Sequence, residues 1–106
     1  MANMMKLMKQ AASMQKDMER IQDELAKKPV EFSSGGGMVT ATAMGDGSIT
    51  GIRIDPKVID PAEREMLEDL VLAAVDGALK KARDMAATEM GKLTAGMGLP
   101  GMFGSK

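Results

Sequence analysis

The stretch SSGGGMVTATAMGDGSITGIRIDP, residues 33–56, contains the signals that decide the fold. Residues 38–44 and 48–54 have the composition and alternation of two strands. The Gly-Asp-Gly sequence of residues 45–47 predicts a hairpin turn between them, because such turns need the positive φ angles that glycine adopts readily. Alternation then places the apolar residues of the first strand on one face: Val39, Ala41 and Ala43.

The return strand has apolar residues on both faces. Alternation puts Ile49 on one face and Ile52 and Ile54 on the other. The segment from Val30 to Phe32 predicts an edge strand, which completes a three-stranded antiparallel sheet. We therefore expect both faces of this sheet to need cover.

The triple glycine of residues 35–37 raises the question of a phosphate-binding loop. Such a loop needs a helix directly after it, whose amides point at the anion, and a Lys followed by Ser or Thr after the last glycine. Here Met38 and Val39 occupy those two positions and a strand follows. The sequence favours a bend or bulge beside the sheet over a nucleotide site.

The composition argues against catalysis. The chain has no Cys and no His, so it lacks thiolate chemistry and the commonest general base and metal ligand. A calcium-binding loop at Asp46 is not favoured. Such a loop needs oxygen-bearing side chains at alternate positions, and the residues after Ser48 are apolar. The remaining acidic cluster suits the first turns of a helix and comprises Glu63, Glu65, Glu68 and Asp69. We expect a non-enzyme that needs no cofactor or metal.

A long helix is predicted from Asn3 to Lys28, where Pro29 stops it. Its apolar residues recur at spacings of three and four and form a heptad seam: Met4, Leu7, Ala11, Met14, Met18, Ile21 and Leu25. Such a seam is typical of a helix that packs on another helix, in a core or in a dimer. The alternative is an adaptable, methionine-rich binding surface.

A second helix is predicted from Asp60 to about Met90. Asp60 is its N-cap, Pro61 takes the first position and Glu63 completes a capping box. Gly77 lies among alanines in its interior, where glycine costs about 1 kcal/mol relative to alanine, so we expect a packing reason for it. These elements predict one α+β domain over residues 1–92. Residues 93–106 predict a flexible Gly/Met-rich tail whose large apolar side chains are Leu93, Met97, Leu99, Met102 and Phe103.

Charge is nearly balanced overall but unevenly distributed. The chain has 14 basic and 15 acidic residues, yet residues 1–16 carry three lysines and no acid. Residues 17–76 carry six basic and 13 acidic groups, and residues 77–106 carry five basic and two acidic groups. If the helices lie antiparallel, two basic ends fall near each other and could contact DNA phosphates. The alternative is that these cations only solvate helix faces and favour a helix C-terminus.

The remaining features limit location and ligand class. The chain has no Trp or Tyr and two Phe, which leaves little for stacking on single-stranded bases. Its start lacks the apolar region of a signal peptide. The longest apolar run, Leu70 to Val75, is far short of the roughly 20 residues of a membrane span. We expect a cytoplasmic protein without membrane contact.

Four segments together resemble one known family. They are MMKLMKQAASMQKDMERIQDELA, GGGMVTATAMGDGSITGIRIDP, IDPAEREMLEDLVLAAVDGALKKA and GMGLPGMF, in this order along nearly the whole chain. The sequence resembles the YbaB/EbfC family of bacterial nucleoid-associated proteins. The resemblance implies an α-β-β-β-α protomer and a tweezer-like homodimer with projecting helices.

The resemblance also implies a function. It implies a protein of the cytoplasm and nucleoid that binds double-stranded DNA without catalysis and modulates nucleoid organisation and gene expression. In the family the DNA surface is attributed to the terminal helices, and the basic residues at those positions here are Lys6, Lys9, Lys16, Arg20, Lys80, Lys81, Arg83 and Lys92. The alternative is an interaction protein, whose Met-rich helix and tail engage a replication or recombination partner while DNA contact is incidental.

Overall fold

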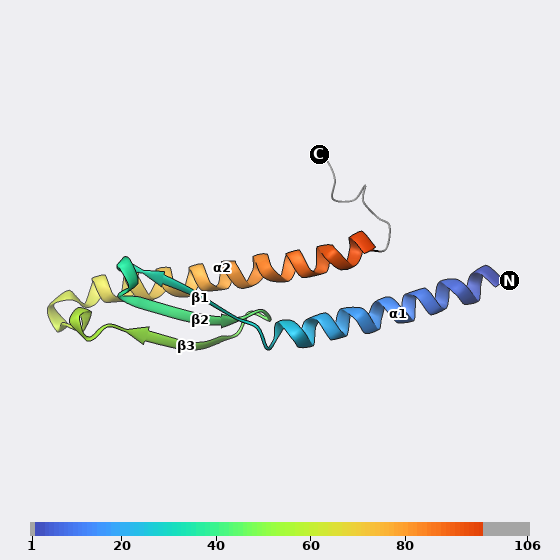
Figure 1. The fold of residues 1–106 in the computed structure, drawn as a ribbon. Helices are drawn as coiled ribbons and strands as arrows, with labels where there is room; N and C mark the ends of the chain where they lie inside the picture. Colours follow the sequence, from blue (N-terminus) through green and yellow to red (C-terminus); the bar gives the residue numbers. More distant parts are fainter. Residues whose placement is uncertain (1, 97–106) are drawn as a thin grey trace, which may run out of the picture.

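The computed structural model describes residues 2–96 and contains two long helices joined through a small sheet (Figure 1). The elements follow the order α1 (Ala2–Leu25), β1 (Pro29–Ser34), β2 (Val39–Met44), β3 (Ile49–Ile54) and α2 (Arg64–Gly96). Three short 3₁₀ turns connect them: η1 (Gly35–Gly37), η2 (Pro56–Val58) and η3 (Pro61–Glu63). This order confirms the predicted α-β-β-β-α architecture.

The sheet is antiparallel throughout, with strand order β1-β2-β3. Helix α2 lies along β1 and β2, whereas β3 forms the edge farther from the helix (Figure 1). As predicted from alternation, the apolar residues of β2 share the covered face, and all three are fully buried there: Val39, Ala41 and Ala43.

The core between helix and sheet is made of small side chains. Ala74, Ala78 and Ala82 of α2 are fully buried against β2, and Val39 is the one large side chain that is fully buried in the described part of the chain. Gly77 belongs to the same interface, because a Cβ there would lie 2.2 Å from Cδ2 of Phe32. The prediction that Gly77 has a packing role is confirmed.

A β-bulge overturns the prediction that both sheet faces are apolar. Thr42 pairs with Gly51 and Ala43 pairs with Ile49, so Thr50 is an extra residue in β3. Because the extra residue reverses the alternation, Ile49 lies opposite Ala43 and joins Ile52 and Ile54 on the face that α2 partly covers. The placement of Ile49 on the opposite face from Ile52 and Ile54 was wrong.

The other face of the sheet is polar. Ser33 and Thr40 join their hydroxyl oxygens at 2.7 Å, and Arg53 forms an ion pair with Glu31 at 3.3 Å. This face therefore accepts water and needs no apolar partner.

Helix boundaries differ from the expected ones at three points. Helix α1 ends at Leu25, three residues before the predicted end, and a turn leads into Pro29. The capping arrangement is also different: Asp60 accepts a hydrogen bond from the amide of Ala62 at 3.0 Å and caps η3, and no bond within residues 2–96 returns from the Glu63 carboxylate. Helix α2 continues past Met90 through Gly96, so part of the predicted tail is helical and residues 97–106 lie outside the described residues.

The molecule is long and thin. Its principal extents are 73 × 30 × 16 Å and its radius of gyration is 19.8 Å, whereas a compact domain of this length has about 13 Å. The two helices run antiparallel, and the N-terminal part of α1 projects beyond the end of α2 (Figure 1). The chain therefore presents a large surface for its small core.

Candidate nucleic-acid interface

The projecting end of α1 carries basic side chains on one face. A helix turns about 100° per residue, so Lys6, Lys9, Lys16 and Arg20 fall within an arc of about 80°. The heptad seam faces the opposite direction on the same helix. Basic and apolar residues of α1 are thus separated on two sides, which leaves the cations available to an external anion.

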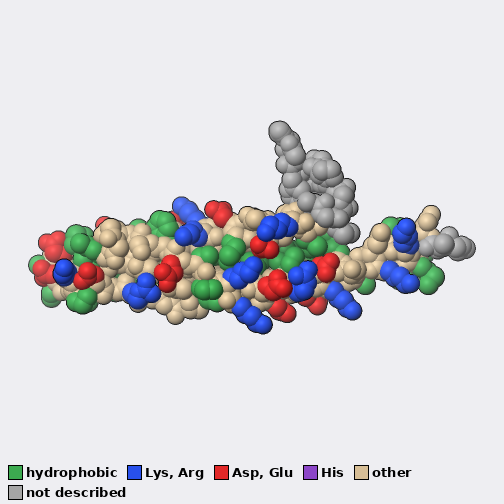
Figure 2. Space-filling model, viewed as in Figure 1, with side chains coloured by type: hydrophobic (Ala, Val, Ile, Leu, Met, Phe, Trp, Pro, Cys, Tyr) green, Lys and Arg blue, Asp and Glu red, His purple; other side chains and the backbone are tan. Residues whose placement is uncertain are grey.

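The outer half of this basic face has no neighbouring acid. Residues 2–16 contain no Asp or Glu, and Figure 2 shows blue side chains without red ones on the visible face of the outer part of α1. Within residues 2–96, no ion pair involves Lys6, Lys9 or Lys16, and all three are exposed. Lys6 and Lys9 thus form a positive region without a carboxylate nearby on the same helix, whereas Lys16 is followed by Asp17 and, three residues on, by Glu19.

Nearer the sheet, the cations of α1 and α2 are partly paired. Arg20 lies 3.4 Å from Glu24 and 3.7 Å from Asp17, all on α1. Lys80 lies 3.1 Å from Asp76, and Lys92 lies 3.4 Å from Glu89. The Arg20 and Lys80 pairs are solvent-exposed, whereas the Glu89 side chain in the Lys92 pair is half-buried. Exposed pairs contribute only about 0–1 kcal/mol, so a phosphate can replace the carboxylate in the exposed pairs at little cost.

Lys81 differs from its neighbours in orientation. Its Nζ donates a hydrogen bond to the backbone oxygen of Glu31 at 2.8 Å and so ties α2 to β1. Arg83 is exposed, and no ion pair in the described part of the chain involves it. On α2, Lys80 and Arg83 are therefore better placed for an external anion than Lys81, which already has a structural partner.

Three further cations were not singled out from the sequence. Lys27, Lys28 and Lys57 are exposed, and none takes part in an ion pair within the described residues. The charge pattern did not indicate these three lysines as DNA contacts, because they lie in residues 17–76, where acidic groups outnumber basic ones. They lie in the connection from α1 to β1 and in η2, away from the outer half of α1.

The apolar seam of α1 is covered only at its inner end. Ile21 and Leu25 are 7% and 4% exposed, and Met14 and Met18 are half-buried. At the outer end Met4 and Leu7 are 69% and 63% exposed. The seam prediction holds as packing between α1 and α2 over the inner turns, while the outer turns lack an apolar neighbour among residues 2–96.

A second uncovered apolar surface lies between β3 and α2. It forms a groove whose apolar lining residues are Ile54, Leu67, Val71, Leu72 and Val75. Beside it, on the same face of the sheet, Ile52 is 43% exposed, and Leu72 is 68% exposed on the helix. Of the three isoleucines on this face, Ile54 lines the groove itself, and it lies there because it pairs with buried Val39.

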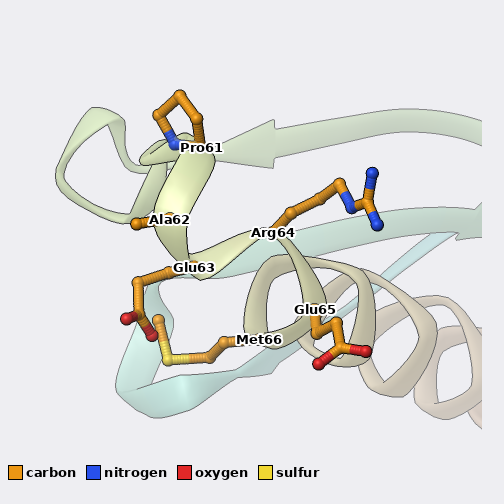
Figure 3. Close-up of a pocket in the computed structure, with 6 residues that line it drawn as sticks. All are labelled: Pro61, Ala62, Glu63, Arg64, Glu65 and Met66. Atoms are coloured by element: carbon orange, nitrogen blue, oxygen red, sulfur yellow. The ribbon is translucent and has the colours of Figure 1, made fainter.

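The start of α2 forms a shallow pocket without convergent chemistry. Figure 3 shows the side chains of Glu63, Arg64 and Glu65 pointing away from one another. Arg64 is instead 3.6 Å from Glu68 on the next turn. A carboxylate pair able to act on one substrate atom is thus not assembled at this pocket.

The glycine turns have structural partners. In η1, Gly35, Gly36 and Gly37 have positive φ angles and lead into strand β2. A Cβ on Gly35 would lie 2.7 Å from Cδ2 of Leu70, and the Ser34 hydroxyl donates to the Leu70 carbonyl at 2.6 Å. The turn thus packs against α2, which supports the bend over the phosphate loop.

The hairpin turn is stabilised by Asp46 and Ser48. Gly47 has the predicted positive φ of 91°. Hydrogen bonds from the Ser48 hydroxyl and amide to the Asp46 carboxylate lower the pKa of Asp46 below its usual value. Asp46 thereby serves its own turn, and no group of acidic side chains within residues 2–96 is arranged to hold a metal ion.

Neither helix of the described chain combines the length and apolarity that crossing a bilayer requires.

Comparisons with known proteins agree with this arrangement. The sequence profile of the YbaB/EbfC DNA-binding family matches residues 1–97. A nucleoid-associated protein of Pelotomaculum thermopropionicum is 50% identical over 101 residues, which cover 95% of this chain and 96% of the relative. A nucleoid-associated protein of Acetivibrio thermocellus is 53% identical over 102 residues, covering 95% and 90% of the two chains.

A solved structure supports the fold independently. An uncharacterised protein from Helicobacter pylori superposes with a TM-score of 0.75 at 18% identity, over 83% of this chain and 92% of that chain. At this identity the likeness concerns the fold alone. The profile and the relatives together show that the chain belongs to the YbaB/EbfC DNA-binding family.

Proposed function

We propose that this chain is a non-catalytic, nucleoid-associated protein that binds duplex DNA as a homodimer. The observation that carries the proposal is the basic face of α1, whose outer lysines project beyond the sheet without an acidic neighbour. The family and the names of the relatives support DNA as the ligand. In that role the protein acts in the cytoplasm and nucleoid, where it modulates nucleoid organisation and gene expression.

The chemistry of this face suits phosphates rather than bases. Lysine is a compact charge on a flexible stem, and it contacts phosphate oxygens without reading sequence. The described helices carry no aromatic side chain on which a base could stack. We therefore expect binding to many DNA sequences with similar affinity. Lys6, Lys9 and Lys16 form the principal contact, and Arg20, Lys80, Arg83 and Lys92 add to it.

The homodimer is part of the proposal because the groove between β3 and α2 needs an apolar cover. The protomer is only 16 Å thick in its shortest extent, and its buried core is mostly alanine. A small domain of this kind gains stability by burying further apolar surface in a second copy. We assign that copy to the groove around Leu72, with the basic helix of each protomer left outside the interface.

The dimer is tested by light scattering after size-exclusion chromatography. Leu72→Glu places a charge in the groove, and we expect it to convert the dimer to a monomer with an unchanged circular dichroism spectrum, since Leu72 is 68% exposed in one protomer. Met66→Glu is the matched control, because Met66 is on the same helix but lines the shallow pocket rather than the groove. A Leu72→Glu protein that remains dimeric would contradict the assigned interface.

DNA binding is tested by fluorescence anisotropy of a labelled duplex at low salt. We compare the wild type with an arm variant, Lys6→Ala/Lys9→Ala/Lys16→Ala, and a control variant, Lys27→Ala/Lys28→Ala/Lys57→Ala. Both variants lose the same charge. The arm variant should bind at least about tenfold more weakly, and the control should lose much less. Equal losses in both variants would mean that net charge, rather than the basic face of α1, governs binding.

An interaction protein is the second candidate, and the bare outer seam of α1 favours it. In that case a protein partner of replication or recombination would dock on Met4 and Leu7 and on residues 91–106, and the complex would survive nuclease treatment. Pull-down with and without nuclease, using the wild type and a chain lacking residues 91–106, separates the two functions. A partner lost on nuclease treatment supports the DNA-binding role.

A further inference from the structure

The outer part of the α1 seam, at Met4 and Leu7, is an apolar surface that the described residues leave exposed. Its residues Met4 and Leu7 are 69% and 63% exposed, and residues 3–13 contain no half-buried or buried position. A helical segment as short as residues 3–13 is only marginally stable in water without tertiary contacts. The outer turns therefore need an apolar partner that residues 2–96 do not supply.

The position of the chain end indicates which segment can supply it. Helix α2 runs antiparallel to α1 and ends level with the middle of α1 along the long axis of the molecule (Figure 1). The C-terminal end of α2, at Gly96, is the end of that helix nearer to the outer turns of α1 (Figure 1). Met14 is the outermost half-buried residue of α1, and it lies about 15 Å along the helix axis from Met4. Ten extended residues reach up to about 33 Å, so residues 97–106 are long enough to span this distance.

The composition of residues 97–106 matches this surface. The segment contains Met97, Leu99, Met102 and Phe103, and its one charged residue is Lys106. None of its side chains is acidic, so its side chains favour the apolar seam over the basic face of α1. DNA is a poor occupant for the seam, because the seam is apolar and points away from the lysines.

We propose that residues 97–106 dock in cis on the outer seam of α1, covering Met4 and Leu7 while the basic face stays open. The docked segment supplies the tertiary contact that the first turns of α1 need. It thereby holds Lys6 and Lys9 in one orientation. Docking needs no DNA, so its test is independent of the function proposed above.

The first test uses the methionines of α1 as reporters of cover. Met4 and Met5 are equally exposed in the described chain, at 69% and 66%, but Met5 points away from the seam. Dilute hydrogen peroxide oxidises methionine according to exposure, so we expect Met4 to be oxidised at least about threefold more slowly than Met5 in the full chain. In a chain ending at Gly96, and in Leu99→Ser/Phe103→Ser at full length, the two rates should become equal.

The outcomes separate the competing occupants. Equal oxidation of Met4 and Met5 in the full chain would overturn the proposal. Slow oxidation of Met4 that persists in the chain ending at Gly96 would also overturn it, because a second copy would then cover the seam. Met66 is 43% exposed at the far end of the molecule and should be oxidised alike in all three proteins.

A second test fixes the geometry. The chain has no cysteine, so Leu7→Cys/Phe103→Cys can form a disulfide without background. We expect a crosslinked monomer on a non-reducing gel, and we expect the matched pair Lys9→Cys/Phe103→Cys to remain largely uncrosslinked because Lys9 faces the other side. A covalent dimer as the main product would place the segment on a second protomer and overturn docking in cis.

Discussion

Replacing Gly77 with alanine should destabilise the protein, although the same change usually strengthens a helix. A Cβ at Gly77 would lie 2.2, 2.4 and 2.5 Å from Cδ2, Cε2 and Cγ of Phe32. Carbon atoms pack favourably at about 3.5–4.0 Å, so the ring has to move by more than about 1 Å. Cγ is attached directly to Cβ of Phe32, so rotation of the ring alone does not relieve the contact.

The expected magnitude follows from three terms. Alanine in a helix interior is worth about 1 kcal/mol over glycine. Overpacking costs about 1–3 kcal/mol, and Phe32, which is 39% exposed, loses part of the roughly 1.5–3 kcal/mol that full burial of such a side chain provides. We expect a net loss of about 1–2 kcal/mol, which corresponds to a fall in Tm of roughly 4–16 °C for a domain of this size.

Gly91 provides the matched control on the same helix. A Cβ at Gly91 meets no heavy atom within 4 Å, so Gly91→Ala should stabilise the protein by about 0.5–1 kcal/mol. Both variants are measured by thermal and urea unfolding at one protein concentration, because an oligomer makes Tm depend on concentration. A Gly77→Ala protein as stable as Gly91→Ala would refute the packing argument. In a Phe32→Ala background, Gly77→Ala should no longer destabilise.

Three further predictions test other contacts. Asp60→Ala removes the hydrogen bond to the Ala62 amide and should lower the free energy of unfolding, measured by urea titration, by about 1 kcal/mol. Asp60→Asn should keep most of that stability, because its side-chain oxygen can still accept the bond. Equal losses in the two variants would contradict the capping role of Asp60. Lys81→Met should weaken DNA binding less than Lys80→Met in anisotropy titrations, because the Lys81 ammonium is held at the Glu31 carbonyl; the reverse order would contradict this. Ser48→Ala should raise the pKa of Asp46 toward its usual value of 3.8, followed by carboxyl chemical shifts against pH. Since the folded pKa is the lower one, the contribution of Asp46 to stability is present above the unfolded pKa and lost as pH falls through the folded value. An unchanged pKa would mean that Ser48 is not the cause.

The order of elements could be predicted from the sequence because each carries a local signal. The alternating residues of β2, the Gly-Asp-Gly turn and the seam of α1 each specify one element without reference to the others. The packing role of Gly77 could also be anticipated, because a glycine among alanines in a helix has a cost that some contact must offset.

The bulge in β3 could not be predicted in this way. A single extra residue, Thr50, reverses the alternation, and its presence depends on how β3 pairs with β2. The error moved Ile49 to the wrong face and suggested two apolar faces, where the structure has one apolar face and one polar face.

Lys81 illustrates a second limit. It was grouped with Lys80 and Arg83 by charge and position, but one residue along a helix is a rotation of about 100°. That rotation turns Lys81 toward the Glu31 carbonyl of β1, and only the packing of helix on sheet reveals it. Conversely, the division of α1 into a basic and an apolar face could have been read from residue spacing alone.

The salt dependence of DNA binding by the arm variant tests the central claim most directly. The slope of log K against log salt is about −0.9 for each phosphate contact. Between about 50 and 200 mM salt, we expect the slope of Lys6→Ala/Lys9→Ala/Lys16→Ala to be shallower than that of the wild type by up to about 2.7 for each protomer whose α1 contacts the duplex, because each such protomer loses up to three contacts. The Lys27→Ala/Lys28→Ala/Lys57→Ala control should keep a slope close to the wild-type value. Identical slopes for the wild type and the arm variant would contradict the assignment of the phosphate contacts to α1.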